Sequence, residues 1–192
     1  MDLVPVIYIE NKEIKTSKTS ECVSLKNFLK ENKNNKKIYI LDIDGIKQDK
    51  PNLCTYQRLA GFYDLWVDNG PRNIGDIVDT TLAGATNITL RKKLLSHLTI
   101  LDIREITENK IFFKVDIHNA KQLYDSDGIV IFNKKENIEL DFKLKEFFKN
   151  MIQKTEIYLY EPNLENQKFW KKLGASGLLV DLENIKDLKN GK

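Results

Sequence analysis

One unit recurs along this chain: a short run of apolar residues ends in an acid or an amide, and a segment with helical periodicity follows. The clearest copy is the segment 65–76, where Leu-Trp-Val is followed by Asp68, a turn of sequence Asn-Gly-Pro-Arg-Asn, and the start of a helix. Glycine and asparagine tolerate left-handed backbone and proline fixes φ, so this turn is tight. Such a turn can present backbone N–H groups to an anion, although an ordinary turn without a ligand explains the residues equally well.

The alternation of apolar runs and helical segments predicts an α/β fold of parallel strands joined by right-handed crossovers. We expect strands over 4–9, 38–41, 64–67, 87–90, 98–103, 128–132, 156–160 and 176–180. We expect helical segments over 20–29, 53–60, 77–82, 91–96, 120–124, 141–153, 164–173 and 183–192. About eight such units close into a barrel. We therefore predict a compact (β/α)8 barrel with shortened helices, which forms a single domain over residues 1–192.

Two alternatives to this assignment stay open. The runs 98–103 and 111–117 both read as the fifth barrel strand; we assign the first and expect the second to fold back over the mouth, and the reverse order is the alternative. An open doubly wound sheet is the rival architecture. It has less support, because no Gly-x-Gly-x-x-Gly turn follows the first strand.

Composition excludes several classes of partner. The charged residues make up 31% of the chain, yet the net charge is only +3, and no basic stripe with interleaved aromatic residues is visible, so nucleic-acid binding is not expected. No apolar run reaches the ~18 residues of a membrane span, and the N-terminus lacks the basic and apolar regions of a signal peptide. The sequence predicts a cytoplasmic protein that contacts neither membrane nor nucleic acid and takes a small-molecule ligand.

Four segments of the chain together resemble a known family. They are 4–7, 39–46, 64–73 and 177–180. In this order they are similar to archaeal proteins related to HisA, the histidine-biosynthesis isomerase that opens and rearranges the ribosyl part of phosphoribosylformimino-aminoimidazole-carboxamide ribotide. The resemblance implies a (β/α)8 barrel with its site at the carboxyl ends of the strands, a phosphosugar ligand and no required cofactor.

The resemblance also implies two inward acids, one a general acid and the other a general base. The strand-one acid is replaced by Tyr8, whose hydroxyl, with a pKa near 10, is a poor base at neutral pH. The strand-five acid corresponds to Asp102, or to Asp116 if 111–117 is the fifth strand. The strand-six position corresponds to Asn133. Whether the chain is an enzyme therefore stays open, and we expect altered or reduced isomerase activity.

The phosphate sites implied by the resemblance are only partly present. Gly70 and Arg72 keep part of the turn after strand three. After strand seven, Glu161 and Pro162 replace a glycine-rich turn, and Asp181 follows strand eight. Proline lacks an N–H donor, and a negative charge repels phosphate. These positions are therefore poorly suited to bind a ligand with two phosphates.

The strand ends also form a possible acidic ring at one mouth, independently of the resemblance. Its members are Asp42, Asp68, Glu161 and Asp181, together with Glu10 and Asp102. Such a ring suits a divalent cation with oxygen ligands, or an amine-bearing ligand. The alternative is that these acids cap helices or face solvent. A metal- or amine-dependent enzyme and a non-catalytic binding or assembly module are therefore the competing hypotheses.

Overall fold

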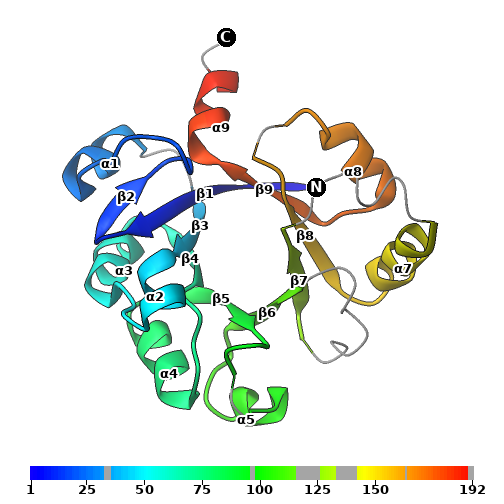
Figure 1. The fold of residues 1–192 in the computed structure, drawn as a ribbon, viewed down its shortest axis with the longest axis horizontal. Coiled ribbons are helices and arrows are strands. Elements are labelled where there is room, and N and C mark those ends of the chain that lie inside the picture. The colour runs from blue at the N-terminus through cyan, green and yellow to red at the C-terminus, as the bar shows by residue number, and fades with distance from the viewer. Residues whose placement is uncertain (33–35, 96–97, 116–125, 133–141, 163, 190–192) are drawn as a thin grey trace.

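The computed structural model describes residues 1–32, 36–95, 98–115, 126–132, 142–162 and 164–189. In this part of the chain one sheet runs in the order β2-β1-β3-β4-β5-β6-β7-β8-β9, and β9 pairs back onto β1. The barrel strands are β1 (Asp2–Glu10), β3 (Lys37–Asp42), β4 (Asp64–Asp68), β5 (Ala85–Arg91), β6 (Lys110–Val115), β7 (Gly128–Ile131), β8 (Glu156–Tyr160) and β9 (Gly177–Asp181). All neighbouring barrel strands are parallel. The predicted (β/α)8 barrel is confirmed (Figure 1).

Short helices surround the closed barrel (Figure 1). They are α1 (Leu25–Glu31), α2 (Ile43–Gln48), α3 (Leu53–Ala60), α4 (Ile74–Leu82), α5 (Ile100–Arg104), α7 (Phe142–Ile152), α8 (Gln167–Leu173) and α9 (Leu182–Lys189). Their lengths follow from local stop and start signals. Asn73 and Asp76 form a reciprocal capping box that starts α4, and Gly174 ends α8 in the left-handed conformation. Short strand β2 (Glu13–Lys15) forms an antiparallel hairpin with the end of β1.

The assignment of strand five was wrong. Residues 100–104 form α5, which begins with a capping box between Thr99 and Asp102, and the fifth barrel strand is β6, between β5 and β7. The spacing Thr-x-x-Asp before an apolar run is a helix-start signature, and it outweighs the strand-like composition of 98–103. The expected helix over 91–96 is also wrong for its described part, which forms turns, and the expected helix over 120–124 lies outside the described residues.

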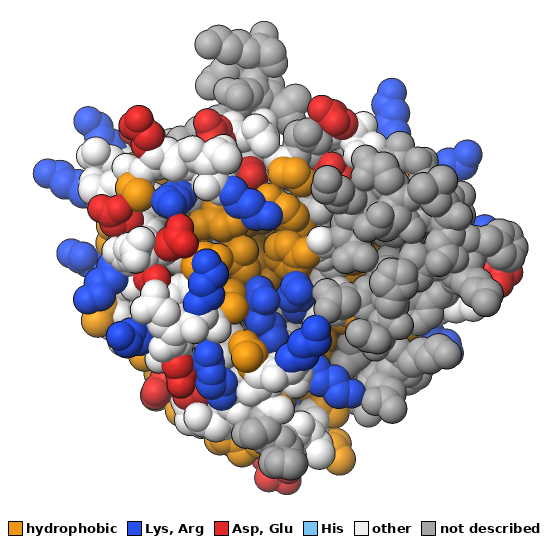
Figure 2. Space-filling view, in the orientation of Figure 1, with side chains coloured by type: hydrophobic (Ala, Val, Ile, Leu, Met, Phe, Trp, Pro, Cys, Tyr) orange, Lys and Arg blue, Asp and Glu red, His pale blue; other side chains and the backbone are white. Residues whose placement is uncertain are grey.

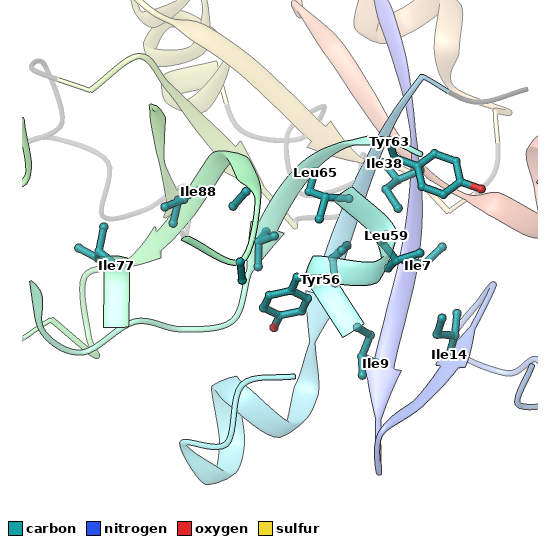
Figure 3. Packing of buried hydrophobic residues seen from close by; sticks show 14 of the residues in the cluster. Ile7, Ile9, Ile14, Ile38, Tyr56, Leu59, Tyr63, Leu65, Ile77 and Ile88 are labelled. Atoms are coloured by element: carbon teal, nitrogen blue, oxygen red, sulfur yellow. The ribbon is translucent and has the colours of Figure 1, made fainter. Parts of the chain in front are cut away.

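Two apolar layers line the two faces of the barrel wall, because successive strand residues point to opposite faces. The outer layer packs against the helices: Figure 3 shows Ile7 and Ile9 of β1 close to Tyr56 and Leu59 of α3. The inner layer fills the barrel. Its members include Val6, Tyr8, Tyr39, Trp66, Phe112, Val130, Tyr158, Tyr160 and Leu179. Burial of both layers is the main force that closes the sheet.

Aromatic contacts define the centre of the barrel. The ring of Trp66 lies 4.2 Å from that of Phe112 and 4.7 Å from that of Tyr158, measured between centroids. The Trp66 Nε1–H donates to Thr89 Oγ1 at 2.8 Å, so the buried indole keeps a hydrogen-bond partner. The centre of the barrel is therefore mainly apolar, and its buried polar atoms are paired with one another. Among the described helices, none is long and apolar enough to cross a membrane.

Candidate functional site at the barrel mouth

The carboxyl ends of the strands face the viewer in Figure 1, where α2, which directly follows β3, lies in front of α3. The same face is shown in Figure 2. Among the described side chains, lysines and arginines lie to the left of and below an apolar centre, and acidic side chains lie mainly towards the top and the left. In (β/α)8 enzymes this face holds the active site. The side chains that project from the strand ends are therefore the candidate site.

Tyr8, Tyr160 and Asp181 form one hydrogen-bonded group at this mouth. The Tyr8 hydroxyl donates to Asp181 Oδ1 at 2.6 Å, and the Tyr160 hydroxyl approaches the same oxygen at 3.0 Å. The two hydroxyl oxygens are 2.8 Å apart. Burial and the hydrogen bond to Asp181 raise the pKa of Tyr8 far above its ordinary value. Tyr8 is therefore a neutral hydrogen-bond donor and not a base.

Opposing influences act on the pKa of the Asp181 carboxylate. Burial raises its pKa, whereas the tyrosine hydrogen bonds and the Lys18 ammonium act against the rise; the net result is a raised pKa. Lys18, from the loop after β2, also lies 4.9 Å from the centre of the Tyr160 ring. This cation–π distance places a positive charge beside the three hydrogen-bonded groups.

A second buried group joins the ends of β4 and β5. Asp68 is completely buried, and it accepts two hydrogen bonds of 2.8 Å from Arg91. The Tyr39 hydroxyl donates to Asp68 as well, at 3.0 Å. A two-point guanidinium–carboxylate contact is stronger and more directional than a single ion pair. Asp68 is therefore neutralised inside the protein.

Two further acids of the expected ring, Asp42 and Glu161, are also bound within the protein. Asp42 caps α2 by accepting from the Gly45 N–H at 3.1 Å, and it further accepts from Asn52 and Tyr56. Glu161 accepts from Trp170 Nε1 at 2.7 Å and from Asn166. Within the described part of the chain, no group of three metal-ligating side chains occurs. The geometry thus favours structural roles for these two acids.

The turn after β4 is filled by a side chain of its own helix. Asp76 Oδ2 accepts from the backbone N–H of Arg72 at 2.7 Å and from that of Asn73 at 3.3 Å. The Arg72 guanidinium donates to three backbone carbonyls, of Gly45, Ile46 and Gly70, and pairs with Asp49. Asp76 therefore occupies donors that a phosphate at this turn would need.

Of the predicted catalytic positions, the structure describes Tyr8 and Asp102, and it does not bring these two together. Asp102 lies in the first turn of α5, where the backbone N–H and hydroxyl of Thr99 lower its pKa. This position at a helix start is a correction to its expected place on a barrel strand. Asn133 and Asp116 lie outside the described residues. Of the two described positions, Tyr8 lies in the inner layer of the barrel and Asp102 does not.

Lys114 is a mouth residue that sequence reasoning missed. It lies on β6 two residues after the inward Phe112, and its ammonium is 5.9 Å from the centre of the Phe132 ring. With the correct fifth strand, the alternation of inward and outward residues would have identified it. The mouth therefore combines Lys18, Arg91 and Lys114 with the Asp181 group.

No known family model matches the sequence, and no curated protein does so. Solved structures match the fold. They include N-acetylneuraminate lyase from Mycoplasma synoviae (TM-score 0.59, 12% identity, 98% of this chain and 74% of that one). A second is a protein assigned as a dihydrodipicolinate synthetase from Pseudomonas aeruginosa (0.59, 9%, 99% and 77%). A third is assigned as a phosphonomutase from Burkholderia cenocepacia J2315 (0.52, 10%, 85% and 87%). These distant likenesses show a (β/α)8 barrel and do not single out relatives of HisA.

Proposed function

We propose that this chain is an isomerase-like barrel of altered activity, related to HisA, whose mouth binds an anionic small molecule such as a phosphosugar. The observation that carries the proposal is the charge arrangement at the mouth. Among the described residues, lysine and arginine side chains border the apolar centre to the left and below (Figure 2), while Asp42, Asp68, Glu161 and Asp181 all accept hydrogen bonds inside the protein.

Several cationic side chains among the described residues stand at this mouth. Arg91 is matched by Asp68, and Lys18 lies near Asp181. Lys114 adds a charge from β6, and the exposed residues 92 and 93, both lysines, directly follow β5. Two unit charges at 4 Å attract by about 4 kcal/mol at an effective dielectric constant of 20. A phosphate group thus has a favourable electrostatic environment at this face, and the attraction weakens with added salt.

The altered activity follows from the replaced groups. The position of the strand-one acid is occupied by Tyr8, which donates to Asp181 and stays protonated at neutral pH. Asp76 occupies the N–H groups of the turn after β4. The mouth therefore offers the histidine-pathway ribotide neither a base on strand one nor a free phosphate-binding turn after β4. We expect purified protein not to convert this ribotide; turnover within ~10³-fold of a typical kcat/KM would contradict the proposal.

The binding test is a series of thermal melts with one additive at a time: ribose 5-phosphate, inorganic phosphate, ribose, Mg²⁺ or Mn²⁺. A ligand that binds only the folded state raises the melting temperature. We expect ribose 5-phosphate to raise it most, phosphate less, and ribose and the metals not at all. Stabilisation by the metals without stabilisation by the phosphates would overturn the proposal and favour the acidic-ring alternative.

A pair of variants locates the effect. Lys114→Met removes a charge at the mouth, and we expect it to weaken stabilisation by ribose 5-phosphate. Lys168→Met removes an exposed lysine from α8 and serves as the matched control. Equal losses in both variants would show that the phosphate responds to overall charge and not to the mouth. Binding without any turnover of phosphosugars would favour the non-catalytic module.

A further inference from the structure

We infer that Asp181 is the proton-accepting base of this mouth, held in place by Tyr8 and Tyr160, and that it acts on a carbon-bound proton next to a carbonyl group. This inference rests on the proposed function, which supplies a phosphorylated ligand at the same face. It places the catalytic carboxylate on β9, the strand next to β1, in place of the acid that Tyr8 replaces.

Both tyrosine hydroxyls converge on one oxygen of the carboxylate. Tyr8 and Tyr160 lie 2.6 and 3.0 Å from Asp181 Oδ1, and 2.8 Å from each other. Two hydroxyl protons serve these three contacts, so the shortest one is best assigned to Tyr8 as donor. The strand pairing sets Val6 of β1 opposite Asp181, and Tyr8, two residues further along the same face, reaches over it. The contacts fix the carboxylate in one rotamer, with Tyr8 and Tyr160 as positioning residues.

The other carboxylate oxygen has no such partner. Asp181 Oδ2 accepts no hydrogen bond from the residues that the structure describes, and it is not one of the buried side-chain atoms without a partner. A small part of Oδ2 therefore stays open to solvent, although the residue as a whole is only 5% exposed. One oxygen is fixed and the other is available, as a general base requires.

The charges around Asp181 suit this role. Lys18 faces it from the loop after β2, and Glu183 faces it from α9. Burial raises the pKa of Asp181 from its ordinary value, and the tyrosines and Lys18 keep that rise limited. A carboxylate with a raised pKa is a stronger base than an exposed one when it is ionised. Lys18 is also a cation near the base, where negative charge would develop on a ligand oxygen.

The step balances without an oxidant, a reductant or a cofactor. Asp181 Oδ2 takes the proton from the carbon next to the carbonyl, and the electron pair of that C–H bond forms a carbon–carbon double bond. The π pair of the carbonyl moves to its oxygen, which becomes an enolate stabilised by nearby cations. Return of a proton from the carboxylic acid restores the ligand. In D₂O the acid exchanges its proton, so deuterium replaces the carbon-bound hydrogen.

The experiment follows this exchange by proton NMR, with ribulose 5-phosphate as the probe in D₂O. We expect the wild-type protein to exchange the hydrogens next to the carbonyl, and Asp181→Asn to be slower by about 10²–10⁴-fold. Asp79→Asn, which changes an exposed acid on α4, is the control and should match wild type. Calorimetry with the same probe measures binding separately.

Tyr8→Phe tests positioning. Loss of its hydrogen bond raises the pKa of Asp181, so the rise of the exchange rate with pH should move to higher pH; a merely structural role would lower the rate equally at every pH. Binding without Asp181-dependent exchange overturns the inference and leaves the proposed function intact. Absence of binding overturns the proposed function, and the inference with it. Melting curves of each variant confirm that it is folded.

Discussion

The guanidinium group of Arg91 closes on the carboxylate of Asp68 through two hydrogen bonds, Nε to Oδ1 and Nη2 to Oδ2, each 2.8 Å long. The two residues end neighbouring strands, β4 and β5, and the carboxylate is completely buried. Their contact ties together two strand ends whose own backbone pairing extends only to Val67 and Ile88. The pair thus stabilises the rim of the barrel at its mouth.

Removal of one partner should cost more than removal of both. Arg91→Met leaves a buried, uncompensated carboxylate, and we expect a loss of about 3–5 kcal/mol in the free energy of unfolding. Arg91→Met combined with Asp68→Asn should be less destabilised than Arg91→Met alone. Lys110→Met breaks the exposed pair with Glu156 and should change stability by about 1 kcal/mol or less. Denaturant titrations measure all three; a double variant as unstable as Arg91→Met alone, or more so, would contradict the prediction.

Tyr56 should matter more at neutral than at acidic pH. Burial raises the pKa of Asp42, and the hydrogen bond from Tyr56 favours its ionised form. Tyr56→Phe should therefore lose about 1–3 kcal/mol at pH 7 and less near pH 4, where more of Asp42 is protonated. Tyr63→Phe is the matched control, because the Tyr63 hydroxyl donates to the uncharged carbonyl of Asn32. Its loss should not depend on pH in this range. Equal pH dependence in both variants would refute the prediction.

Asp127 should stabilise the folded protein at neutral pH, and this stabilisation should be lost at acidic pH. Burial acts to raise its pKa, but the N–H of Ile111, at 2.7 Å, and the Arg104 guanidinium outweigh it and lower the pKa. A lowered folded-state pKa contributes stability that is fully present above the unfolded value of about 3.9 and is lost as the pH falls through the folded value. Asp127→Asn should flatten this acid limb in melts recorded against pH. Asp79→Asn should leave the limb unchanged.

Replacement by alanine should have opposite effects on stability at two glycines. Gly70 has φ +68°, and a Cβ atom there would lie 2.8 Å from Leu94 Cδ1 and 3.2 Å from Ile46 Cα. Gly70→Ala should therefore cost about 1–3 kcal/mol. Gly61 has φ −68°, and a Cβ atom added there would meet nothing within 4 Å. Gly61→Ala should be neutral or stabilising by about 0.4–1 kcal/mol, because it restricts the unfolded chain. Thermal melts of the two variants measure both changes in stability.

Local signals in the sequence were enough for most of the barrel. Apolar runs placed the strands near Val4, Ile38 and Asp64 because a strand buried on both faces leaves a continuous apolar segment. The failure at 98–103 has an equally local cause. A short apolar run does not distinguish a strand from a helix, whereas the Thr99–Asp102 capping box marks a helix start.

The sequence by itself determined the alternation of strands and helices, the tyrosine at position 8 of the first strand, and the presence of an acid at several strand ends. It did not determine what those acids do. Tyr8 and Asp181 are 173 positions apart, and they meet only because β9 closes the barrel onto β1. Whether a carboxylate caps a helix, pairs with an arginine or keeps one oxygen open depends on donors supplied by other elements. Hydrogen bonds and ion pairs act over a few ångströms of space, and distance along the chain does not encode that proximity.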